Sequence, residues 1–88
     1  MTIEHLEYVT IEPAVLDAWE RIALELEDAG RAVRLEFADV RREPSRHNLR
    51  CAARAARHAE RSTTGDAATM ASALATVLEE AAETQTAA

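Results

Sequence analysis

The feature that most constrains the fold is a stripe of apolar side chains that recurs every three or four residues from Val15 onward. At about 100° per residue these side chains lie on one face of a helix, with charged residues on the opposite face. Pro13 suits the first position of such a helix, because its missing N–H would have no intrahelical partner there. The pattern predicts a helix that begins at Pro13 and buries Val15, Ala18, Trp19, Ile22, Ala23, Leu26 and Ala29.

Gly30 is typical of a helix C-terminus, yet the apolar stripe continues beyond it without a change of phase. If one helix ended at Gly30 and another began after it, the apolar stripes of the two helices would not be expected to share the same angular phase. We therefore predict one long helix over residues 13–42, with Gly30 inside it at a cost of about 1 kcal/mol. Pro44 ends this helix, since the residue before a proline is disfavoured in the α region. The helix presents one core or oligomer seam, formed by Val15, Trp19, Ile22, Leu26, Val33, Phe37 and Val40.

Two short segments also fit the alternation of a β-strand. Residues 7–11 and 33–37 alternate charged or polar side chains with apolar ones, and periodicity alone does not assign runs this short. The alternative fold is therefore α+β, with two short strands flanking the first helix. Residues 1–12 form an N-terminal segment that is either a strand or a short helix.

Two shorter helices are predicted after Pro44. Ser45 is a favoured N-cap residue, and the helix that follows it to about Arg61 has a narrow apolar face made almost entirely of alanine. Residues 62–65 form a turn, and a third helix follows with a second apolar stripe. We predict an all-α bundle with one long helix and a shorter helical hairpin, forming a single domain over residues 13–84. Residues 85–88 are predicted to be a frayed tail.

The apolar residues are unusually small, which makes self-association an expectation. Hydrophobic residues make up 48% of the 88-residue chain, and 20 of them are alanine. Alanine favours helices but buries little area per residue, so a bundle of this size has a marginal core. A helix of thirty residues is also longer than either later helix, and its uncovered part would be available to a second subunit. We expect a homo-oligomer.

Charge is unevenly distributed along the chain, although the net charge is −6. Residues 1–30 carry eight acidic residues and one arginine, whereas residues 31–61 carry nine arginines against four acidic residues. Within the second half of this basic region, five arginines are spaced three or four residues apart and fall within about 80° on a helical wheel. They form one ridge, flanked by His47 and His58: Arg46, Arg50, Arg54, Arg57 and Arg61.

The arginine ridge has three interpretations. It can be a solvated face with weak ion pairs to the other helices, a docking surface for an acidic partner protein, or a surface that follows nucleic-acid phosphates. The predicted pI near 5.0 and the lack of aromatic residues between the arginines disfavour nucleic acid. We therefore predict a non-enzymatic interaction or regulatory module that binds itself and an acidic protein surface. A nucleic-acid-binding regulator using the same arginines is the alternative.

The sequence offers little for catalysis or cofactor binding. Cys51 is the single cysteine, the three histidines lie far apart, and there is no lysine for Schiff-base or phosphate-loop chemistry. We expect no catalytic residue, no metal site and no cofactor. No apolar run approaches the roughly 20 residues that span a bilayer, and the N-terminus lacks signal-peptide features, so a cytoplasmic location without a membrane partner is expected. High alanine with arginine in place of lysine favours a bacterial or phage source.

Overall fold

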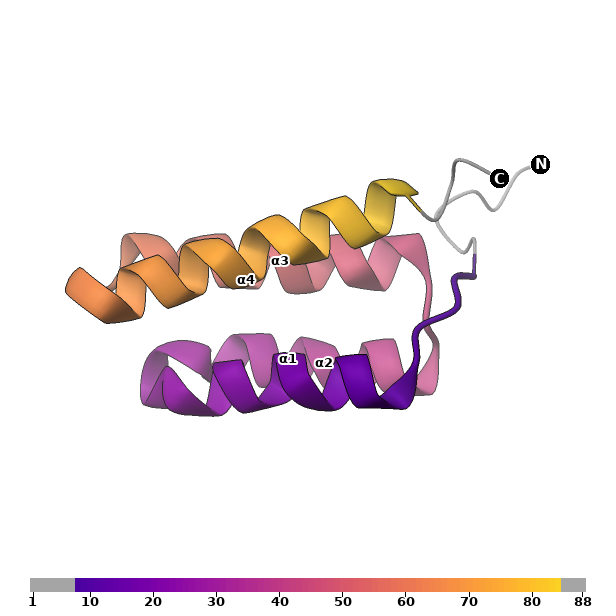
Figure 1. The fold of residues 1–88 in the computed structure, drawn as a ribbon, viewed down its shortest axis with the longest axis horizontal. Coiled ribbons are helices and arrows are strands. Elements are labelled where there is room, and N and C mark those ends of the chain that lie inside the picture. The colour runs from indigo at the N-terminus through magenta and orange to yellow at the C-terminus, as the bar shows by residue number, and fades with distance from the viewer. Residues whose placement is uncertain (1–7, 85–88) are drawn as a thin grey trace.

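The computed structural model describes residues 8–84, which fold into an antiparallel bundle of α-helices. The elements are α1 (Pro13–Glu25), the 3₁₀-helix η2 (Glu27–Gly30), α2 (Arg31–Arg42), α3 (Arg46–Arg61) and α4 (Gly65–Thr84). Figure 1 shows α1 and α2 in one layer and α3 and α4 in the other, with the chain reversing direction at each turn. The prediction of a small all-α bundle is confirmed.

The prediction of one long helix over residues 13–42 is wrong. α1 ends at Glu25, and Glu27 has a φ of 55°, which takes the backbone out of the right-handed helix. α2 then runs back along α1, so that the Trp19 and Phe37 rings stack with centroids 6.4 Å apart. In a continuous helix these two residues would be about 27 Å apart. The apolar stripe keeps its phase because both helices face the same core.

Gly30 and Arg34 complete this turn between α1 and α2. A Cβ at residue 30 would overlap the carbonyl oxygen of Ala23, so the close return of the chain requires glycine. Arg34 donates from one guanidinium nitrogen to the carbonyl oxygens of Ala23 and Glu27, each at 3.2 Å. The Ala23 carbonyl also accepts from the Leu26 N–H at 3.2 Å, so Arg34 adds a side-chain bond across the turn to the backbone bond that ends α1.

The α+β alternative is also wrong, because residues 33–37 lie within α2. The extended segment at residues 8–12 makes an antiparallel bridge between Tyr8 and Ser45. Beside it the Val9 N–H donates to the Pro44 carbonyl at 2.9 Å, and the Tyr8 hydroxyl donates to Glu43 at 3.2 Å. This segment therefore packs along the α2–α3 connection. The predictions for residues 1–7 and for the tail at 85–88 lie outside the described residues.

The core lies between the two layers and contains much alanine. Of the predicted seam, Leu26, Val33, Phe37 and Val40 are buried, and Trp19 and Ile22 pack against the core while partly exposed. Val15 is 40% exposed and is not a core residue, because Leu16 takes the inward position at that turn of α1. The remaining buried apolar side chains come mainly from the second hairpin, including Leu49, Ala52, Ala56, Ala71, Leu74, Ala75 and Leu78.

Ser45 acts as the predicted N-cap of α3. Its buried hydroxyl oxygen accepts from the Asn48 N–H at 3.1 Å, while the Asn48 side chain donates to the Glu43 carbonyl at 2.7 Å. The α2–α3 connection is thus fixed by side-chain bonds on both sides of Pro44. Among residues 8–84, no helix is both long enough and apolar enough to cross a membrane.

Candidate functional site

The arginine ridge lies along the border between α3 and α4. On α3 the buried face consists of Leu49 and four alanines, which lets α4 approach closely. The burial of the ridge arginines divides them into two groups. Arg46 and Arg57 are half-buried, whereas Arg50, Arg54 and Arg61 are exposed.

Arg57 ties α3 to α4. Its Nε and one terminal nitrogen donate to the two carboxylate oxygens of Glu79, each at 2.9 Å, and its other terminal nitrogen donates to Glu60 at 2.9 Å. Thr76 and Ser72 of α4 accept further bonds at 3.2 and 3.4 Å. Hydrogen bonding to Glu79 and Glu60 raises the pKa of Arg57, and the same contact with Arg57 lowers the pKa of Glu79. Arg57 is therefore a structural residue.

Arg46 is the second ridge arginine whose side chain interacts within the chain. It occupies the first turn of α3, is half-buried and makes polar contacts of its own. These two arginines were predicted as partner-binding residues. The structure places both where their side chains interact within the chain, so they offer less to a partner than the other three.

Three ridge residues form an exposed surface, which we call the arginine face: Arg50, Arg54 and Arg61. Within residues 8–84, none of them takes part in an ion pair, and Arg54 contacts the Cys51 sulfur at 3.7 Å. From Arg50 to Arg61 the face extends about 16 Å along α3. It presents three guanidinium groups that can form charged hydrogen bonds with a partner.

Cys51 lies next to the arginine face and is half-buried. Its sulfur is 3.7 Å from the His47 Nε2 as well as from Arg54. These contacts follow from the helical spacing of the three residues along α3. His58 is exposed further along the same helix.

The first hairpin has a similar arginine that sequence reasoning missed. Arg41 of α2 binds Asp17 at 2.9 Å and Glu20 at 2.7 Å, both on α1, and these bonds raise the pKa of Arg41. All three side chains are substantially exposed. Asp17 and Glu20 are three residues apart and therefore lie on the same face of α1. This spacing does not identify Arg41 as their partner, because Arg41 reaches them only when α2 folds back on α1.

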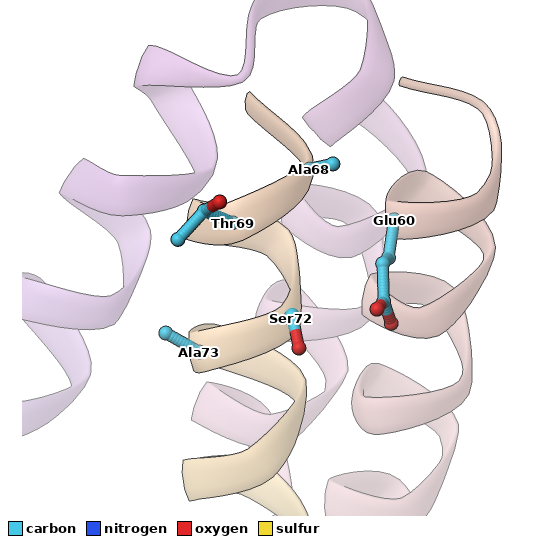
Figure 2. A pocket seen from close by; sticks show the side chains of 5 residues that line it. All are labelled: Glu60, Ala68, Thr69, Ser72 and Ala73. Carbon is cyan, nitrogen blue, oxygen red and sulfur yellow. The ribbon is translucent and has the colours of Figure 1, made fainter. Parts of the chain in front are cut away.

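A shallow, open depression lies on the outer side of the second hairpin. Figure 2 shows Glu60 of α3 beside Ala68 and Ser72 of α4, with Thr69 and Ala73 on the other side of α4. Glu60 already binds Arg57, and the other lining side chains are small and do not titrate. In the described part of the chain, no three His, Cys, Asp or Glu side chains are grouped to hold a metal ion.

Comparisons with protein-family models, with curated proteins and with solved structures find no match to this chain. The arginine face therefore has to be interpreted from its own geometry and charge.

Proposed function

We propose that this protein is a non-enzymatic interaction or regulatory module of the cytoplasm that self-associates and docks an acidic protein surface through the arginine face. The observation that supports this proposal is the division of the ridge. Arg57 is bound to Glu79 and Glu60, whereas Arg50, Arg54 and Arg61 are exposed on one side of α3 without an ion pair inside residues 8–84. Planar guanidinium groups favour two-point pairing with carboxylates, which are the charged groups of an acidic protein surface.

An acidic protein fits this surface better than a nucleic acid does. The neighbouring helix α4 carries four acidic residues and no basic one, so a phosphate backbone laid along α3 would meet repulsion at its edge. Only three arginines of the ridge are exposed, and no aromatic side chain lies among them to stack on bases.

The test measures binding of two probes, labelled poly-L-glutamate and a short DNA duplex, at low salt. The variant replaces Arg50, Arg54 and Arg61 together by Gln, which keeps helix propensity similar. The control replaces Arg21, Arg31 and Arg42 by Gln, three exposed arginines outside α3, and removes the same charge.

We expect the wild type and the control to bind poly-L-glutamate and the α3 variant to lose at least tenfold in affinity, about 1.4 kcal/mol. Equal weakening in the α3 variant and the control would show that net charge alone governs binding and would contradict the proposal. If the wild type bound the duplex more tightly than poly-L-glutamate and the α3 variant lost that binding, the protein would be a nucleic-acid-binding regulator and the proposed acidic protein partner would be wrong.

A further inference from the structure

The charges of the bundle are arranged on opposite corners. Residues 13–30, which form α1 and η2, carry five acidic residues and Arg21, a net charge of −4; α3 carries five arginines and Glu60, a net charge of +4. α1 packs beside α2 and α4 and has no contact with α3, so these two helices lie diagonally across the bundle (Figure 1), whereas η2 does contact the end of α3. Within residues 8–84, no ion pair joins the acidic residues of α1 and η2 to the arginines of α3.

The negative charge is most accessible where α1 ends. We call this region the acidic corner: Leu24, Glu25, Glu27 and Asp28, all exposed, with Leu24 at 58%. Asp17 and Glu20 are bound to Arg41, but within residues 8–84 the three carboxylates of the corner form no ion pair. Arg31 follows directly in α2 and leaves the corner with a net negative charge.

We infer that the acidic surface that fits the arginine face is the acidic corner of a second copy of this chain. The inference rests on the proposed function and names its partner. Three exposed carboxylates would meet three exposed guanidinium groups, with Leu24 as an apolar side chain among them. Pairing two arginine faces or two acidic corners would oppose like charges, so a symmetric dimer through either surface is disfavoured.

Such a contact is head-to-tail. Each copy that docks its acidic corner still has a free arginine face, and the copy that receives it still has a free acidic corner, so the assembly continues unless its rotation closes a ring. One face of a helix of this length, about 24 Å, contributes less area than a standard interface. The association is therefore weak, depends on concentration and weakens as salt rises.

The experiment uses two charge-neutralised variants and sedimentation velocity. The basic-face variant carries Arg50→Gln, Arg54→Gln and Arg61→Gln, and the acidic-corner variant carries Glu25→Gln, Glu27→Gln and Asp28→Asn. Circular dichroism checks that each keeps the helical fold. Protein is measured from about 10 μM to about 1 mM, because interfaces of this size bind weakly.

We expect the average mass of the wild type to rise steadily with concentration and each variant alone to remain a monomer. The two variants mixed should form a 1:1 heterodimer and stop there, because one lacks a working arginine face and the other lacks a working acidic corner. Self-association of either variant at the wild-type level, or no complex in the mixture, would overturn the inference. A monomeric wild type that still binds poly-L-glutamate would overturn the inference and the self-association in the proposed function, but not docking through the arginine face. Loss of that binding as well would overturn the docking too.

Discussion

The α1–α2 hairpin and the α3–α4 hairpin each place one arginine between their helices, but they reverse the chain differently. The first turns through Leu26 and η2, where Glu27 adopts a left-handed conformation and Gly30 sits against the Ala23 carbonyl. The second turns at Ser62–Thr64, where Thr63 donates to Ala59 and the space around Gly65 is open.

The helices of the two hairpins also meet through different side chains. α1 and α2 meet through large ones, including the Trp19–Phe37 stack, whereas the buried faces of α3 and α4 consist mainly of alanine, with Leu49, Leu74 and Leu78. We therefore expect the stability of the first hairpin to depend most on its turn, and the stability of the second to depend most on its long interface and on Arg57.

The largest expected effect is that of Gly30→Ala. The new Cβ would overlap a backbone carbonyl that cannot move without displacing α1, so we expect a loss of about 3 kcal/mol in unfolding free energy. Gly65→Ala is the matched control: its φ of 64° strains the new side chain, but nothing lies near it, so about 1 kcal/mol is expected. Urea denaturation measures both variants. If Gly30→Ala instead stabilised the protein, residues 13–42 would be one continuous helix.

Arg57→Gln should give the next largest effect. It removes the two bonds to Glu79 and the bond to Glu60, and we expect a loss of about 1 kcal/mol, which lowers the melting temperature by roughly 4–8 °C. Arg41→Gln in the first hairpin is the comparison, and its effect should be smaller because Arg41 and its partner Asp17 are more exposed than Arg57. A larger loss of stability in Arg41→Gln than in Arg57→Gln would show that the stability of the first hairpin depends on its ion pairs more than that of the second does.

A smaller effect is expected in the pH dependence of stability. The Arg57 contact lowers the pKa of Glu79 in the folded state below its ordinary value of 4.5. The unfolded chain therefore takes up the proton first, and the stability from this pair is full above about pH 4.5 and is lost as the pH falls through the folded pKa. Glu79→Gln should flatten this acid-side loss in thermal melts, whereas Glu25→Gln, at an exposed residue without an ion pair, should keep it. Identical acid-side loss in Glu79→Gln and the wild type would contradict the contact.

The sequence predicted the helical class, the Ser45 cap and the apolar face of α3, because each depends on residues close together in the chain. It did not predict the reversal at Leu26–Gly30, since Val33 and Phe37 keep the same phase whether the helix continues or folds back onto the same core.

The different roles of Arg54 and Arg57 were also beyond the sequence. They are three residues apart and share the ridge, and only the register of α4, which brings Glu79 to Arg57, separates them. The acidic corner was visible only as an excess of negative charge in residues 1–30.

The most direct test of the proposed arginine face compares Arg57→Gln with the triple variant Arg50→Gln, Arg54→Gln, Arg61→Gln. Thermal melting and poly-L-glutamate binding are measured on the same samples. We predict that Arg57→Gln lowers the melting temperature and keeps binding, and that the triple variant keeps the melting temperature, with a change of under about 0.5 kcal/mol, and loses binding. A triple variant that melts as early as Arg57→Gln would show that the whole ridge is structural and would contradict an interaction surface on α3.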